Sequence, residues 1–267
     1  MNGTILDIFR IDRLGKGIFT KILFTLALLV GCSVYFFPLG DTDFTRFISW
    51  AQDAMNDPEI LINTTYMEIP LTVGNLIYLG HILASDLFIL LCSVIYSAVY
   101  IRQYRLEHKL KDPGDSGYLI PPKYLKASSV GKLMLRMVIV FCFSLVLMIP
   151  ASFVMLYLFL IFIIILPCVS MYPACYLSGD TDFFGSFSEM VKVTKGYYVV
   201  NARNMFLIIT LYFLGRWITS AMMSVIPSAA YVSGPLITVF LALSYGRYVG
   251  MIYCRMREVP GGLRVRI

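Results

Sequence analysis

Long apolar stretches alternate with polar segments along the whole chain. A helix needs about 20 apolar residues to cross the hydrocarbon core of a bilayer, and five regions of this chain reach that length. The region from Leu133 to Leu177 has no charge except Arg136 near its start and is too long for one crossing, so we divide it at Pro150-Ala151-Ser152. The pattern predicts an all-α polytopic membrane protein, a single domain over 1–267 with six transmembrane helices at 17–38, 74–101, 133–150, 152–176, 204–226 and 234–254.

Basic residues gather in alternate polar segments. Most of the Lys and Arg residues lie before the first apolar stretch, in the 102–132 loop, in the loop that precedes residue 204, and in the C-terminal tail. The 38–73 loop instead carries six acidic residues and one basic residue, Arg46. Because cytoplasmic loops of membrane proteins are enriched in Lys and Arg, we predict that both termini and the 102–132 loop are cytoplasmic and that the 38–73 loop is outside.

Amphipathic segments are expected beside the membrane. Residues 182–196 form a predicted cytoplasmic helix, with acidic residues near its start and Gly196 at its end. The N-terminal segment before the first span has one mainly apolar side and predicts a short interfacial helix. In the outer loop, apolar residues from Phe44 to Met55 recur at helical spacing and predict an anchor at the water boundary, with a substrate-capturing cap as the alternative.

The pentapeptide GDTDF occurs twice, at 40–44 and at 179–183. The predicted topology puts the two copies on opposite sides of the membrane. That arrangement is typical of inverted repeats in transporters, but spans three and six align poorly. Since Asp and Thr before a helix satisfy its free N–H groups, two helix caps are the preferred interpretation.

Composition agrees with a membrane environment. The chain of 267 residues is 58% hydrophobic and 14% charged, with a mean hydropathy of +0.77, whereas soluble domains have about a quarter of their residues charged. An excess of Lys and Arg in cytoplasmic loops accounts for the net charge of +6, so nucleic acid is not an expected partner. None of the six cysteines forms a CxxC pair, so neither a disulfide framework nor a metal site is indicated.

Four ionisable residues fall at membrane depth, away from the ends of the predicted spans: His81, Asp86, Arg216 and Arg247. A charge near the bilayer centre is costly and is a functional candidate by default. Asp86 and Arg216 reach similar depths, so we predict a buried pair between them, direct or bridged by water. A clamp that specifies helix packing is the preferred role, and a solute or proton path is the alternative. The predicted intramembrane polar cluster comprises Asp86, Arg216, Arg247, His81, Asn75, Ser93 and Tyr212.

Catalytic chemistry is not indicated. The chain has only two histidines, on opposite sides of the predicted membrane, and contains no HExxH, P-loop or GxGxxG sequence. We therefore predict no catalytic residues, no cofactor and no metal.

The segment from Leu166 to Trp217 resembles part of an uncharacterised group of bacterial integral membrane proteins, the family known as domain of unknown function nine hundred seventy-five. The resemblance covers about the last 100 residues and implies a bacterial multi-span protein without assigning an activity. It rests on Tyr172-Pro173, Gly179-Asp180, Ser188-Glu189, Lys195-Gly196 and Trp217.

The leading functional hypothesis is a non-enzymatic membrane subunit or accessory factor for transport or envelope assembly. It would lie in the bacterial inner membrane, contact lipids, and associate with other membrane subunits or a cytoplasmic ATPase docked at Glu189, Lys192 and Lys195. The alternatives are a permease for a small or lipid-like solute that uses the Asp86 and Arg216 cluster, and an intramembrane lipid-modifying enzyme, which is disfavoured.

Overall fold

The computed structural model describes residues 7–13, 17–57, 69–110, 131–143, 159–178, 181–195 and 197–258. These residues are 88% helical and include no strand, as the all-α prediction requires. Residues 131–143 are helical. The other helices are η1 (Ile11–Arg13), α2 (Ile18–Phe36), α3 (Thr45–Asn56), α5 (Val73–Leu110), α8 (Phe159–Val169), α9 (Tyr172–Leu177), α10 (Phe183–Lys195), α11 (Tyr198–Val225) and α12 (Pro227–Glu258).

Among the described residues, four helices are long and apolar enough to cross a membrane: α2, α5, α11 and α12. They correspond to the first, second, fifth and sixth predicted spans. The third and fourth predicted spans include residues 144–158, which lie outside the described residues. The structure therefore supports a multi-span membrane protein with four candidate spans among the described residues, and the count of six stays a prediction.

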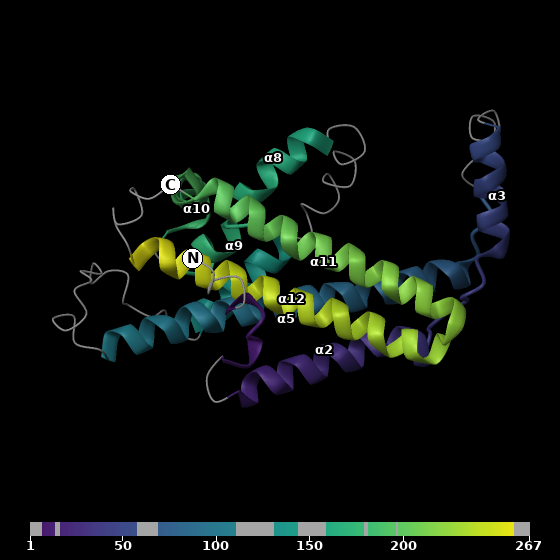
Figure 1. Cartoon of the computed structure of the whole chain (residues 1–267), viewed down its shortest axis with the longest axis horizontal. Helices are drawn as coiled ribbons and strands as arrows, with labels where there is room; N and C mark the ends of the chain where they lie inside the picture. Colours follow the sequence, from purple (N-terminus) through teal and green to yellow (C-terminus); the bar gives the residue numbers. More distant parts are fainter. Residues whose placement is uncertain are drawn as a thin grey trace.

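The four long helices form one elongated bundle with α12 at its centre (Figure 1). Helix α12 packs against α5, α11 and α2, and α2 also packs against α5. Helix α2 begins and α12 ends at the same end of the bundle, where α10 also lies, whereas α3 stands across the opposite end (Figure 1). The two GDTDF copies, which precede α3 and α10, consequently lie at opposite ends.

The closest helix contact joins α5 to α12, where the two glycines of the Gly246 to Gly250 segment face α5. A Cβ atom on Gly246 would lie 2.4 Å from the carbonyl oxygen of Ser93. The Ser93 hydroxyl donates to the carbonyl of Ala242 at 2.7 Å. Small residues let helix backbones approach in this way, so the GxxxG spacing positions the central helix of the bundle.

The predicted fourth span, 152–176, is not one continuous helix in its described part. Helix α8 ends at Val169 and α9 begins at Tyr172. Pro173 lies in the first turn of α9, and a proline has no N–H with which to continue the preceding helix. The carbonyl of Pro167 accepts hydrogen bonds from Ser170 Oγ at 2.9 Å and from the side-chain amide of Asn201 in α11, so the break is stabilised by tertiary contacts.

Two arginines cap the C-terminal end of α9. Arg136 donates to the carbonyls of Tyr176 at 2.5 Å and Thr181 at 2.9 Å, and Arg105 of α5 donates to the carbonyl of Ser178 at 2.5 Å. The last carbonyls of a helix have no partner inside the helix, so these guanidinium groups supply their hydrogen bonds. Helix α5 continues beyond 101, the predicted end of the second span, to Leu110 and brings Arg105 to this position.

The N-terminal segment differs from the predicted interfacial helix. Ile8 is fully buried and belongs to the main hydrophobic cluster, with Phe9 packed against it. The apolar side of this segment therefore contacts the protein. Among the described residues of this segment, 7–8 and η1 are helical.

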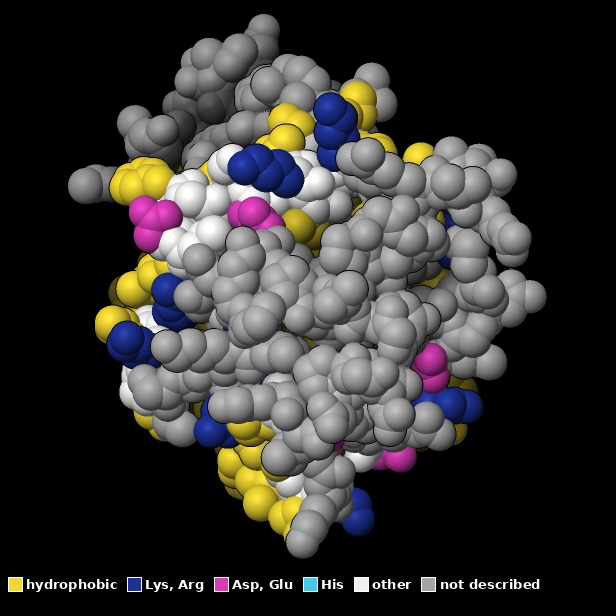
Figure 2. All heavy atoms as spheres, turned by 90° about the vertical axis from the view of Figure 1, so that its left-hand side faces the viewer, with side chains coloured by type: hydrophobic (Ala, Val, Ile, Leu, Met, Phe, Trp, Pro, Cys, Tyr) yellow, Lys and Arg dark blue, Asp and Glu magenta, His cyan; other side chains and the backbone are white. Residues whose placement is uncertain are grey.

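The two ends of the bundle differ in charge. Figure 2 shows the end at which α12 finishes, and Lys and Arg side chains lie around its edge. The opposite end, around α3, carries Asp41, Asp43, Asp53 and Asp57 with Arg46 as the one described Lys or Arg of its loop. This asymmetry is the pattern from which the cytoplasmic side was predicted.

Candidate functional site

All four long helices line one cavity in the half of the bundle nearest α3. It encloses about 130 Å³, whereas one water needs about 10–15 Å³ measured in this way. Several waters or a small polar group therefore fit inside. The lining residues are Gly31, Val34 and Tyr35 from α2, Tyr78, Ile82, Ser85, Asp86 and Ile89 from α5, Tyr212 and Arg216 from α11, and Gly234, Pro235 and Thr238 from α12.

Asp86 and Arg216 lie in this cavity together, on α5 and α11. No ion pair within 4.0 Å joins them, and neither side chain hydrogen-bonds to another described residue. The prediction placed the two charges together, and the structure does so without direct contact. Both side chains are exposed in the protein, so the predicted burial of the pair is wrong for the described chain.

The exposure of the two charges follows from the helix arrangement. Helices α5 and α11 each pack on α12 but do not pack closely against one another along their described residues. Asp86 on α5 and Arg216 on α11 both line the cavity. Two opposite charges face a common space that no described side chain fills.

The cavity lies between the α3 end of the bundle and the middle of the long helices. Asp86 is thirteen residues after Val73 and Arg216 nine residues before Val225, which places them about 20 Å and 14 Å from those helix ends at 1.5 Å per residue. A hydrocarbon core is about 30 Å thick, so in a bilayer spanned by these helices both charges are near the centre. Tyr35 and Tyr78 line the part of the cavity nearer the helix ends.

Tyrosines gather at that shallow part of the cavity. Tyr35 stacks on Tyr231 with ring centroids 5.4 Å apart, and Tyr78 also lines this part of the cavity, whereas Tyr212 lies deeper, thirteen residues before Val225. Tyrosine has an apolar ring and a polar tip, so it suits a boundary between lipid and water. These rings give the cavity a polar entrance on the side of α3.

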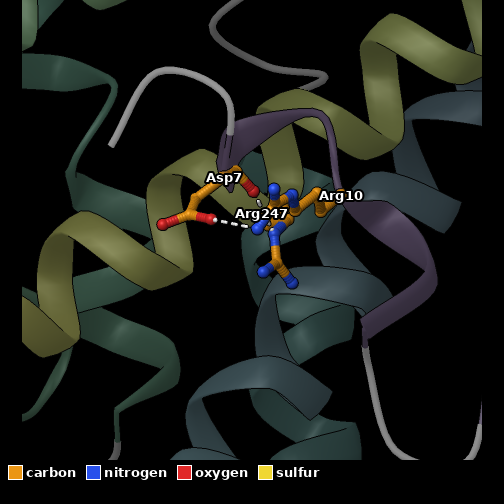
Figure 3. Close-up of polar contacts among 3 residues, drawn as sticks. All are labelled: Asp7, Arg10 and Arg247. Carbon is orange, nitrogen blue, oxygen red and sulfur yellow. Dashed lines mark hydrogen bonds and ion pairs between the residues drawn. The ribbon is translucent and has the colours of Figure 1, made fainter. Parts of the chain in front are cut away.

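Arg247, predicted as a member of the Asp86 cluster, performs a different role. Its Nε donates to the carbonyl of Asp7 at 2.6 Å and one terminal nitrogen reaches the hydroxyl of Tyr96 at 3.4 Å. Tyr96 in turn donates to the carbonyl of Ile11 at 2.8 Å, and Arg10 pairs with the Asp7 carboxylate at 3.3 Å (Figure 3). Arg247 therefore fastens the N-terminal segment to α5 and α12, away from the cavity.

Asn75 is buried at the start of α5 and also lies outside the cavity. Its amide nitrogen donates to the carbonyls of Asp41 at 3.0 Å and Asp43 at 2.9 Å, and its carbonyl oxygen accepts from the hydroxyl of Thr72 at 2.8 Å. These bonds hold the first GDTDF copy against α5. The predicted polar cluster placed Asn75 with Asp86, and the structure separates them.

His81 connects α5 to the end of α2. The backbone N–H of Leu39 donates to Nδ1 at 3.3 Å, and Nε2 lies 3.2 Å from the hydroxyl of Ser33. Ser33 donates its own proton to the carbonyl of Val30 at 2.7 Å, so a neutral His81 protonated at Nε2 satisfies every bond. Of the seven predicted cluster residues, the cavity contains Asp86, Arg216 and Tyr212, while Ser93 lies at the α5–α12 contact.

The partner-docking candidates lie on α10. Lys192 and Lys195 are exposed in its last turns, and Glu189 is half-buried. Asp182 precedes the helix and accepts the N–H of Gly185 at 2.9 Å, which is the predicted cap. In the first GDTDF copy, Asp43 instead accepts the N–H and hydroxyl of Thr45, at 2.9 and 2.6 Å. The identical pentapeptides therefore start their helices with different turns.

The sequence pattern did not indicate the cavity residues other than Asp86, Arg216 and Tyr212. Tyr78 and Ile82 precede Asp86 by eight and four residues, so helical spacing from Asp86 was the available signal. Tyr35, Pro235 and Thr238 carried no such signal, because only the packing of α2 and α12 brings them to the site.

No group of three or more His, Cys, Asp or Glu residues able to hold a metal ion occurs in the described part of the chain. No protein-family model, curated protein or solved structure matches the chain. The functional interpretation therefore rests on the geometry of the cavity.

Proposed function

We propose that this chain is a non-catalytic multi-span membrane protein of a transport system, and that it binds a small polar or lipid-like solute in the cavity that contains Asp86 and Arg216. The observation that carries the proposal is the presence of two opposite, unpaired charges in one cavity lined by all four long helices. Unpaired charges in hydrocarbon are costly and mark solute or ion pathways.

The same observation favours transport over a structural clamp. A clamp stabilises helix packing through direct contact between its charged groups, and Asp86 and Arg216 make no such contact. Their separation leaves room for water or a solute between them, as in the alternative hypothesis from the sequence. A bacterial inner membrane with both termini in the cytoplasm is part of the proposal, supported by the basic side chains at one end of the bundle (Figure 2).

A second candidate function is that of an accessory subunit, the hypothesis preferred from the sequence. Its support is α10, which presents exposed Lys192 and Lys195 at the basic end of the bundle. A cytoplasmic ATPase or another soluble partner would dock there. The resemblance to the uncharacterised bacterial family is compatible with either function.

Thermal unfolding of Asp86→Asn, Arg216→Gln and the double variant distinguishes a solute site from a clamp. Because neither side chain contacts the other, we expect each single variant to unfold within about 0.5 kcal/mol of the wild type and the two effects to add. Strong destabilisation by each single change, relieved in the double variant, would establish the clamp and contradict the proposal. Asp53→Asn, an exposed change on α3, is the matched control for loss of a carboxylate.

A further inference from the structure

The cavity holds a separated negative and positive charge. The Asp86 carboxylate comes from α5 and the Arg216 guanidinium from α11, and no described residue neutralises either one. A ligand with a single charge would satisfy one group and leave the other unpaired. A zwitterion satisfies both, because its ammonium group pairs with the carboxylate and its anionic group pairs with the guanidinium.

The tyrosines of the cavity favour an ammonium-bearing ligand as well. Tyr35, Tyr78 and Tyr212 line the same space as Asp86. Faces of aromatic rings attract ammonium cations, most strongly where water is excluded. The planar guanidinium of Arg216 matches a phosphate or carboxylate group with two parallel hydrogen bonds.

Helices α5 and α11 do not pack closely against one another along their described residues. Apolar side chains border the charges on both helices: Leu83 is 52% exposed, Phe213 67% and Trp217 71%. A phospholipid can therefore place its headgroup between Asp86 and Arg216 while its acyl chains stay against these residues.

On these grounds we infer that the cavity binds a zwitterion carrying an ammonium group and a phosphate or carboxylate, with Asp86 binding the ammonium and Arg216 the anionic group. The inference rests on the proposed function and names its class of solute. A phosphatidylethanolamine headgroup and free phosphoethanolamine share this chemistry. The exposed apolar side chains beside the two charges make the lipid the expected source.

The test measures which lipids the full chain retains. The protein is placed in nanodiscs that contain equal amounts of phosphatidylethanolamine and phosphatidylglycerol. It is then released from the nanodiscs, and native mass spectrometry counts the lipids that stay bound to it. We expect the wild type to retain the ethanolamine lipid about ten-fold over the glycerol lipid, since the glycerol lipid has no ammonium group for Asp86. Equal retention of the two lipids by the wild type overturns the inference without the use of any variant.

Variants of Asp86 and Arg216 test which group of the ligand each residue binds. Asp86→Asn removes the partner of the ammonium group and is expected to shift retention about ten-fold toward phosphatidylglycerol. Arg216→Gln is expected to lower retention of both lipids, and Asp53→Asn on α3 to leave the ratio unchanged. An unchanged ratio in Asp86→Asn contradicts the role given to Asp86.

A competition experiment distinguishes a lipid headgroup from free phosphoethanolamine as the ligand. Added phosphoethanolamine displaces the lipid if the site takes the free molecule, whereas inorganic phosphate does not. Retention that resists phosphoethanolamine identifies the lipid as the ligand. If the unfolding data exclude a clamp and the wild type still shows no lipid preference, this inference fails while the proposed function stands.

Discussion

At the scale of single residues, the polar cluster predicted from the sequence contains two kinds of side chain. Asn75, His81 and Arg247 form hydrogen bonds that join segments distant in sequence. Asp86 and Arg216 form no hydrogen bond or ion pair with a described residue. A charge near the centre of a bilayer is costly, so the first kind explains how the segments are held and the second indicates a site.

The pH dependence of the start of α3 tests the hydrogen bonds between Thr45 and the Asp43 carboxylate. Hydrogen bonds from the hydroxyl and then the N–H of Thr45 hold the pKa of Asp43 below its ordinary value. The stabilisation is therefore present above the ordinary pKa of an aspartate and is lost as the pH falls through the lowered value. We expect the amide signal of Thr45 in NMR spectra to titrate below the usual range for aspartate.

Asp43→Asn is the control for this titration. An asparagine still accepts the N–H of Thr45 but does not ionise, so the Thr45 signal should lose the pH dependence. A Thr45 signal that titrates in the ordinary aspartate range would show that the bond in the structure does not form.

At the scale of helices, the contact between α5 and α12 depends on a backbone approach that only glycine allows. Gly246→Ala places a methyl group 2.4 Å from the Ser93 carbonyl oxygen, so the helices must separate. Overpacking of this kind costs about 1–3 kcal/mol. We expect thermal unfolding in detergent to occur at a lower temperature in this variant.

Gly80→Ala provides the matched control, because a Cβ atom there meets nothing within 4 Å. It lies in α5, the other helix of this contact, and alanine favours a helix over glycine by about 1 kcal/mol, so its stability should be equal or higher. Equal destabilisation by both substitutions would mean that the loss of stability does not come from the α5–α12 contact.

Helices were the most predictable feature, and their ends the least. Uninterrupted apolar runs predicted α2, α11 and α12, because period and length are local properties of the sequence. The extension of α5 to Leu110 was not predicted, since Arg105 is stabilised there by the carbonyl of Ser178, a residue distant in sequence. The break after Val169 was missed although two prolines indicate it, because the apolar run itself continues through them.

At the scale of the whole molecule, the structure unites a charge-asymmetric bundle with a cavity that reaches its middle. Depth along the helices placed Asp86 and Arg216 near one another from the sequence alone. The sequence did not reveal that they stay apart, because their separation depends on α12 lying between α5 and α11. That arrangement makes the space between the two charges available to water or a solute.

The measurement that tests this account most directly is the reactivity of single cysteines with a charged, membrane-impermeant thiol reagent in a cysteine-free background. Ile82→Cys and Thr238→Cys place a thiol in the cavity, and Leu83→Cys places one at the same depth on the exposed apolar surface. The account predicts rapid labelling of the two cavity cysteines from the side of α3 and slow labelling of Leu83→Cys, because a thiol in lipid does not ionise. Equal labelling of Ile82→Cys and Leu83→Cys would contradict a water-accessible cavity at Asp86 and Arg216.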